Sequence, residues 1–357
     1  MENYISSERN NCISTIKKID RATYFCSKRT ISIDFFRFFF MVLICLWHFS
    51  NNIRLVYHGY IGVEFFFILS GVFLFQTYCA HPELNSQNYL TNRFARFFPK
   101  YIFCLIPIFT LVNYQWIKEI DINSITDIIL RFVAEGLMLQ GFGIFPGCSN
   151  YPTWYLSVLL FGGGIIFSFL KISRKRSLYI FFPIFAILSY MFIFSDGKSC
   201  IERWGFQNGV YIPFIRGMAD ICLGVLFMAI ISYNRNFLEK KAKALNCISC
   251  ISFFLLILII TIEPSHDQYC LFLIPFTLIG CFMKNSLFNQ IFIHPIWSEL
   301  GNISYEMFLI HAFIIKMYAH TIMPIISSSI LIIAIYMTIV TITAYLIHLL
   351  FKIVWGR

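Results

Sequence analysis

The sequence predicts an all-α fold, a polytopic membrane helix bundle of about ten transmembrane helices with both termini in the cytoplasm. Of its 357 residues, 58% are hydrophobic and 13% are charged, and the mean hydropathy is +0.72. Water-soluble domains carry about 25% charged residues, so this composition excludes an ordinary soluble protein. Apolar runs long enough to cross a bilayer recur along the chain, and basic and non-basic loops alternate between them.

Ten apolar runs of about 17–24 residues account for most of the chain. Pro107 and Pro275 interrupt the third and the eighth of these runs. Within the loop 116–152, apolar side chains recur at helical spacing and predict a re-entrant or interfacial helix around 124–140. The runs cover approximately residues 31–50, 59–79, 99–115, 153–171, 178–195, 210–232, 246–262, 268–283, 301–320 and 328–351.

Lysine and arginine gather in every second loop, which is the pattern of cytoplasmic loops. Basic segments precede the first run and follow the second, fourth, sixth and eighth runs, and Lys352 and Arg357 follow the last. The net charge of +10 therefore reflects membrane topology, and we expect no nucleic-acid partner. An anionic substrate that enters from the cytoplasm could use some of the same charges.

We expect one membrane domain at 31–351, a basic cytoplasmic leader at 1–30 and a short cytoplasmic tail at 352–357. The leader has no small-residue cleavage site before the first run, so it is not a signal peptide. The 12 cysteines show no framework spacing, and no metal site is expected. Cys148 and Cys200 both fall in segments expected outside the membrane, where a disulfide could form.

The first run contains an arginine and a histidine, both costly at membrane depth. Arg37 and His48 are eleven residues apart, which places them within about 20° on one helix face and roughly 16 Å apart along the axis. His48 could act as a general base, or it could be an interfacial histidine bonded to a loop carbonyl. Arg37 could bind phosphate oxygens, or it could extend to the lipid head groups with Asp34 as its ion-pair partner.

Three further sets of polar residues occur within or beside apolar runs. Glu64 opens the second run near the same end as His48, where it could orient the imidazole, hold a hydroxyl or simply face water. Arg93 and Arg96 share one side of a cytoplasmic helix start, as a phosphate cradle or as stop-transfer charge. The ninth run carries Glu306 and His311, which we expect to pack against other buried polar groups.

Six motifs follow one another along about residues 31–320. They are Asp34–Arg37–His48; Gly59 to Gly71, which contains Glu64 and Ser70; Arg93, Arg96, Pro99 and Tyr101; Trp154 to Ser157; loosely Arg216, Asp220 and Gly224; and Gly301 to His311, which contains Tyr305. This ordered set resembles the acyltransferase 3 family of integral membrane acyltransferases. Two departures from the family pattern stand out: Phe35 replaces a glycine, and Leu159 stands where many members have a glutamate.

The resemblance implies transfer of an acyl group, usually acetyl, from cytoplasmic acyl-CoA to a hydroxyl of a cell-surface glycan or lipid-linked saccharide. It implies catalytic roles for His48 and Glu64 and binding of the CoA phosphates by Arg37, Arg93 and Arg96. Either direct transfer or an acyl-histidine intermediate fits these residues. The residues expected to contact substrate or support the site are Asp34, Ser70, Trp154, Tyr305 and His311.

The expected protein is a multi-pass O-acetyltransferase of the cell (inner) membrane. Its partners would be acetyl-CoA, a saccharide or glycolipid acceptor and membrane lipid. Two other classes remain open, a glycan flippase or transporter and a glycan polymerase, because buried charges and a basic cytoplasmic face suit them equally well. Dependence on acyl-CoA distinguishes the acyltransferase from both.

Overall fold

The computed structural model describes residues 30–49, 56–114, 122–144, 148–197, 200–262, 266–321 and 329–355. In these ranges the chain is almost entirely helical, and one two-stranded hairpin forms their only sheet. The predicted all-α class is therefore confirmed. Residues 1–29 of the expected leader and residues 356–357 of the expected tail lie outside the described residues.

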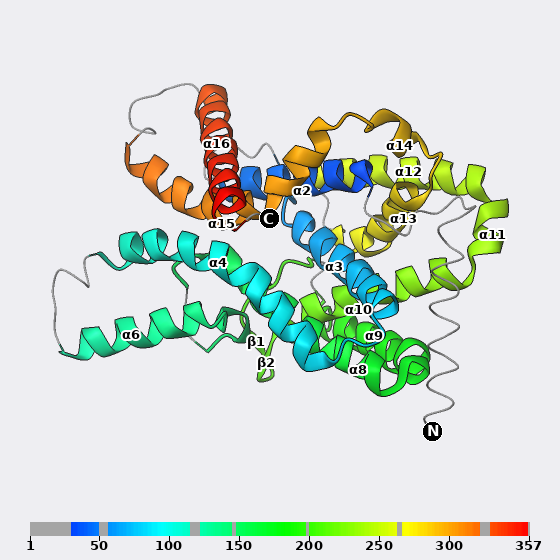
Figure 1. Ribbon diagram of the computed structural model, residues 1–357, viewed down its shortest axis with the longest axis horizontal. Helices are drawn as coiled ribbons and strands as arrows, with labels where there is room; N and C mark the ends of the chain where they lie inside the picture. Colours follow the sequence, from blue (N-terminus) through cyan, green and yellow to red (C-terminus); the bar gives the residue numbers. More distant parts are fainter. Residues whose placement is uncertain are drawn as a thin grey trace.

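The first half of the chain forms long helices joined by short 3-10 and π-helical turns (Figure 1). These are α2 Ile31–Phe49, α3 Ile61–Ala80, α4 Ser86–Val112, α6 Ile122–Gly136, η1 Gln140–Phe142, η2 Tyr151–Thr153, α7 Trp154–Ser157, η3 Val158–Gly162, α8 Gly163–Arg176, η4 Ser177–Phe181 and α9 Phe182–Ile193.

The second half begins with the hairpin and then returns to helices. These elements are β1 Phe206–Gln207, β2 Val210–Tyr211, α10 Ile212–Tyr233, α11 Arg235–Lys240, α12 Ala242–Thr261, η5 Asp267–Tyr269, α13 Cys270–Phe282, α14 Leu287–Ile291, α15 Ile296–Thr321 and α16 Ser329–Trp355.

Each of the ten predicted runs corresponds to a helical segment. In the described part of the chain, 7 helical stretches are long and apolar enough to cross a membrane. One of them, Tyr151–Ile193, is 43 residues long and contains two of the predicted runs; its backbone leaves helical geometry at Ser173, with φ −158° and ψ 97°. The chain is thus a multi-pass membrane protein, while ten spans and cytoplasmic termini stay predictions.

The prolines do not break the helices where the sequence suggested an interruption. Helix α4 continues through Pro99 and Pro107, and α13 continues through Pro275. Membrane helices tolerate proline because neighbouring helices and side chains satisfy the freed backbone groups. Helix α4 also begins thirteen residues before its apolar run, at Ser86, where the Asn85 side chain accepts a hydrogen bond from the Asn88 backbone N–H at 2.7 Å.

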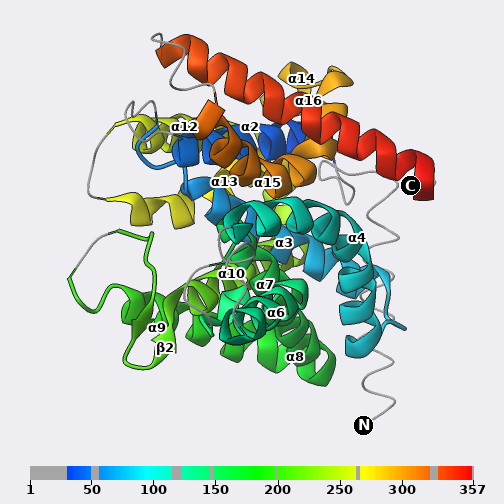
Figure 2. The same ribbon diagram turned by 90° about the vertical axis from the view of Figure 1, so that its left-hand side faces the viewer.

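The helices form two groups that meet along α2 and α3. Helix α3 packs mainly on α10, which also contacts α8 and α9, whereas α2 packs mainly on α15, with α16 outside it. Figure 2 shows α16 crossing the outer side of the second group, and α4 lies beside the first. Helices α2 and α3 contact each other, and α4 contacts both α8 and α15. A site at this junction therefore draws residues from both groups.

Two glycines allow α3 and α10 to touch backbone to backbone. A Cβ atom on Gly224 would lie 1.9 Å from the carbonyl oxygen of Ile68 and 3.0 Å from the Cα atom of Gly71. Only glycine permits such a close approach. The contact brings Glu64 of α3 and Arg216 of α10 within reach of each other.

A third glycine sets the distance between α2 and α15. A Cβ atom on Gly301 would lie 2.5 Å from the Cβ atom of Asp34, so a larger residue would push the two helices apart. His48 lies fourteen residues after Asp34, and His311 lies ten residues after Gly301. The close packing at the start of both helices is followed, farther along, by the contact of His48 with His311 described below.

Helix α6 confirms the helix predicted around 124–140. Its apolar side chains at Ile125, Ile129, Phe132 and Val133 are exposed on the outside of the bundle. An outward apolar face is typical of a helix in contact with lipid. Its location at the membrane interface stays a prediction.

The hairpin between α9 and α10 was not predicted. Asn208 and Gly209 both have positive φ, 49° and 79°, as a two-residue type I′ hairpin turn requires. The hairpin is held against the end of α9, because the Gln207 side chain donates hydrogen bonds to the carbonyl of Phe192 at 3.1 Å and to Ser195 Oγ at 2.9 Å.

Candidate active site

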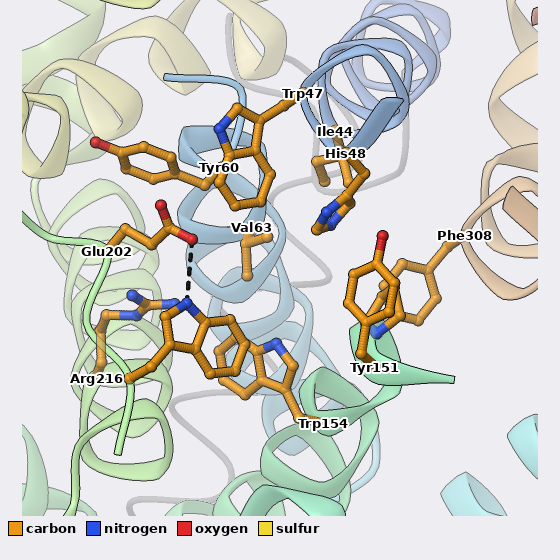
Figure 3. Close-up of a pocket in the computed structure, with 12 residues that line it drawn as sticks. Ile44, Trp47, His48, Tyr60, Val63, Tyr151, Trp154, Glu202, Arg216 and Phe308 are labelled. Carbon is orange, nitrogen blue, oxygen red and sulfur yellow. Dashed lines mark hydrogen bonds between the residues drawn. The ribbon is translucent and has the colours of Figure 1, made fainter. Parts of the chain in front are cut away.

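A small pocket lies at the end of α2, at the junction of the two helix groups (Figure 3). Its volume is about 20 Å³, which is room for roughly one water molecule. We call it the histidine pocket, because the imidazole of His48 points into it. Its walls are formed by Ile44, Trp47, His48, Tyr60, Val63, Tyr151, Pro152, Trp154, Glu202, Trp204, Arg216 and Phe308.

The structure brings His48 of α2 and His311 of α15 together. Their rings stack with centroids 5.3 Å apart and an interplanar angle of 29°. The Nδ1 atom of His311 lies 2.8 Å from the carbonyl oxygen of Phe308. Because a carbonyl can only accept, Nδ1 carries the proton, and Nε2 presents a lone pair. That Nε2 atom is buried and has no hydrogen-bond partner among the described residues.

Two aromatic side chains restrict the orientation of the His48 ring. Trp47 lies 4.6 Å from it and Tyr151 lies 4.9 Å from it, measured between ring centroids. Tyr151 meets the imidazole edge to face at 75°. A ring enclosed by such neighbours has little rotational freedom, so the pocket fixes the orientation of the His48 imidazole.

Of the roles considered for Glu64, orientation of the His48 ring is not supported by a hydrogen bond. Neither carboxylate oxygen of Glu64 has a hydrogen-bond partner among the described residues. Its ionic partner is Arg216, whose Nε atom lies 3.4 Å from Oε1, and both side chains are buried. A carboxylate buried in an apolar bundle requires such a countercharge, and the glycine packing of α3 on α10 brings Arg216 close enough to supply it.

Arg216 connects this ion pair to the histidine pocket. Its guanidinium lies 5.3 Å from the centre of the Trp154 ring and donates a hydrogen bond to the carbonyl of Ile201 at 2.9 Å. Arg216 also forms part of the pocket wall. The ion pair therefore holds the guanidinium group of Arg216 in the wall of the pocket that His48 enters.

A second carboxylate lies near Glu64. Asp220, one turn after Arg216 on α10, is fully buried and interacts electrostatically with Glu64. The hydroxyl of Tyr190, on α9, donates a short hydrogen bond to Asp220. The bond ties α9 to α10, while the other carboxylate oxygen of Asp220, Oδ2, has no hydrogen-bond partner among the described residues.

Two of the arginines expected to bind phosphate lie near one tyrosine. Arg37 pairs with Asp34 at 3.3 Å, as the sequence predicted. Arg93 lies over the ring of Tyr89 at 5.1 Å. Both Arg37 and Arg93 interact electrostatically with the hydroxyl of Tyr155. The two guanidinium groups, from α2 and α4, therefore both contribute to the electrostatic field at this hydroxyl.

Tyr155 also connects the arginines to the histidine pocket. Its hydroxyl lies 3.4 Å from Ser70 Oγ, and its ring lies 5.5 Å from that of Phe308. Phe308 forms part of the pocket wall with His48. Tyr155 and Phe308 thus form a series of packed side chains between Ser70 and the wall of the histidine pocket.

The third arginine, Arg96, lies on α4 one turn after Arg93, and its electrostatic partner Tyr305 lies on α15. The side chain of Arg96 is exposed, and it interacts electrostatically with Tyr305. The Tyr305 hydroxyl donates a hydrogen bond to the carbonyl of Phe97 at 3.1 Å, which ties α15 to α4. Neither residue forms part of the histidine pocket.

A larger cavity adjoins the histidine pocket. Its volume is about 320 Å³, and it shares Tyr151, Trp154 and Trp204 with the pocket. At the boundary, the Trp204 indole donates a hydrogen bond to Glu202 at 3.1 Å; Figure 3 shows this bond. Burial raises the pKa of the Glu202 carboxyl above its usual value. We call this space the outer cavity.

The sequence did not identify several residues of this site. Tyr151, Glu202 and Trp204 lie in turns and loops, where helical periodicity gives no information on which side chains meet. Arg216 was noted only through an inexact motif spacing. The disulfide considered between Cys148 and Cys200 does not form, because both are free thiols in the structure.

The fold and the site define a class, a multi-pass helical membrane protein with a buried histidine pocket. A family model described as an acyltransferase domain matches residues 30–349. Because the match covers most of the chain, this protein belongs to the acyltransferase 3 family, and it is a membrane acyltransferase. No curated protein and no solved structure matches the chain at a significant level.

Proposed function

We propose that this protein transfers an acetyl group from cytoplasmic acetyl-CoA to a hydroxyl of a saccharide, with His48 as the general base. The observation that carries the proposal is the histidine pocket at the far end of α2 from Arg37, which His48 lines while its ring stacks on that of His311. Family membership supports acyl transfer, and the pocket supplies a base for a hydroxyl nucleophile.

In this proposal the arginines bind the CoA phosphates. Arg37 and Arg93 lie around Tyr155, and the exposed Arg96 lies one turn farther along the same helix start. A guanidinium matches phosphate oxygens in a fork of N–H donors. The thioester arm would then follow Tyr155 and Phe308 towards His48, over roughly the 16 Å that eleven helical residues span.

The chemical step is a direct acyl transfer. The acceptor hydroxyl oxygen attacks the thioester carbonyl carbon while His48 takes the hydroxyl proton. The new C–O bond forms, the C–S bond breaks, and the CoA thiolate leaves with the proton returned by His48, giving an ester and the CoA thiol. The positive charge of Arg216, fixed in the pocket wall, stabilises the negative charge that develops on the carbonyl oxygen.

The proposal also includes the membrane, the orientation of the site in it and the acceptor. The protein would reside in the cell (inner) membrane, with the arginines facing the cytoplasm and the histidine pocket near the opposite surface. Its acceptor would be a surface glycan or its lipid-linked precursor. No observation in the described part of the chain favours the flippase or the polymerase.

The test uses the purified protein in lipid nanodiscs with radiolabelled acetyl-CoA and a total glycolipid extract from the producing cells. The wild type should label a glycan. His48→Ala should reduce the rate by about 100-fold or more, the usual contribution of a general base.

His81→Ala is the control, because His81 is exposed and pairs with Glu83, which is also exposed, outside both cavities. It should leave the rate unchanged. Retained acetyl transfer in His48→Ala would overturn the mechanism, and glycan movement without acetyl transfer would favour a flippase instead.

A further inference from the structure

The outer cavity has the size of a small-molecule site. Its volume of about 320 Å³ falls at the lower end of the range for ligand pockets, which suits one or two sugar rings. It lies between α6 and the β1–β2 hairpin and is lined by Arg131, Ala134, Glu135, Gln140, Cys148, Tyr151, Trp154, Trp204 and Tyr211.

Aromatic rings form one part of the cavity wall. Trp154 and Trp204 meet edge to face, with centroids 5.3 Å apart, and Tyr151 and Tyr211 add two further rings. Half of the Trp204 surface is exposed. Large aromatic faces bind apolar surface while their N–H or O–H groups reach polar partners.

One carboxylate in the wall is held in place with an oxygen still available. Oε1 of Glu135 accepts hydrogen bonds from the Ser149 N–H at 2.8 Å and the Ser149 hydroxyl at 2.9 Å. Oε2 is buried and has no hydrogen-bond partner among the described residues. Glu135 is 6% exposed. A buried acceptor without a partner can accept a hydrogen bond from a ligand hydroxyl.

A sugar ring can contact both the aromatic rings and the Glu135 carboxylate of the cavity wall. A pyranose has an apolar face of C–H groups, which can pack on an indole, and a rim of hydroxyls, which donate hydrogen bonds to a carboxylate. A lipid chain would leave the Glu135 carboxylate without a donor.

We propose that the outer cavity is the saccharide subsite, with the sugar packed on Trp204 and hydrogen-bonded to Glu135. The inference rests on the proposed function and adds where the acceptor binds. Because Tyr151, Trp154 and Trp204 border both spaces, a hydroxyl of a sugar in the cavity would face His48.

The test measures acceptor dependence and acceptor binding separately. Trp204→Ala and Glu135→Gln, in nanodiscs, are titrated with the glycolipid extract at saturating acetyl-CoA. The half-saturating extract concentration should rise about tenfold, the effect of losing one good contact, while KM for acetyl-CoA stays within about twofold of the wild-type value. Binding of the extract without acetyl-CoA is followed in parallel by tryptophan fluorescence.

Matched controls separate a local effect from general damage. Trp355→Ala removes a tryptophan of similar exposure, 54% against 50%, far along the sequence at the end of α16. Glu83→Gln neutralises an exposed glutamate. Both should behave as wild type.

The outcomes distinguish the inference from the function on which it rests. If the half-saturating extract concentration is unchanged in both Trp204→Ala and Glu135→Gln, the outer cavity is not the saccharide subsite, and the proposal of acetyl transfer is unaffected. Binding that depends on Trp204 and Glu135, without acetyl transfer by the wild type, would support the subsite and overturn the proposed function. Absence of both binding and transfer would overturn both.

Discussion

Two buried ionic clusters in this bundle differ in their relation to the cavities. Glu64 and Arg216 pair between α3 and α10, and Arg216 forms part of the histidine pocket. Glu306 of α15 binds Lys100 of α4 through a short contact and His348 of α16 at 2.9 Å. None of these last three residues lines the histidine pocket or the outer cavity.

The difference shows that a buried charge does not by itself identify a site. Glu64 and Glu306 are both fully buried, and from the sequence both are acids in apolar runs. Lys100 and His348 retain 24% and 19% exposure, so the second cluster joins three helices near the surface of the bundle. The first cluster instead holds a guanidinium group in the wall of the histidine pocket.

The largest effect is expected when the first cluster loses its cation. Arg216→Met leaves Glu64 buried without its countercharge, which should cost about 3–5 kcal/mol of stability and abolish acetyl transfer. The double variant Glu64→Gln/Arg216→Met should recover the melting temperature but not the activity. Recovery of activity in the double variant would show that this cluster is structural only.

In the second cluster, substitutions should change stability without changing acetyl transfer. Lys100→Met should cost about 1–3 kcal/mol, because Glu306 keeps His348 as a partner. Lys100→Met/Glu306→Gln should recover most of this stability and retain acetyl transfer by the folded protein. Thermal melting in detergent and transfer assays on the same samples check both; a loss of activity at normal stability would contradict the comparison.

A smaller effect is expected at Arg93, two turns before Lys100 on the same helix. Arg93→Gln should raise KM for acetyl-CoA roughly tenfold, because a charged hydrogen bond to phosphate is lost. Lys100→Gln serves as the matched control and should leave KM unchanged. Equal effects of both substitutions would show that α4 contributes only general positive charge.

The smallest effect concerns pH. Burial raises the pKa of Glu202, so its neutral form favours folding below the ordinary carboxyl range, and this stabilisation is lost as the pH rises through the raised pKa. Glu202→Gln should therefore melt about 1 °C higher than wild type at about pH 8, and at the same temperature at about pH 4. A higher melting temperature in acid alone would contradict this sign.

The sequence predicted the helical segments well and their ends less well. Apolar length marks a membrane helix because the bilayer excludes unsatisfied backbone groups, so each run became a helix. The start of α4 at Ser86 and its passage through Pro107 were missed, since polar helix starts and tolerated prolines leave the apolar pattern unchanged.

The partnerships within the site were predicted only in part. The Asp34–Arg37 pair was predicted because both residues lie on one helix turn. The pairing of Glu64 with Arg216, and of His48 with His311, joins residues far apart along the chain. Local spacing carries no information on such contacts.

The sequence by itself determined that this chain is a multi-pass membrane helix bundle, because hydrophobicity and charge act locally along the chain. It also placed Arg37 and His48 on a single helix. Only the tertiary structure decided which buried charges face a cavity, because glycine contacts between helices set which side chains meet.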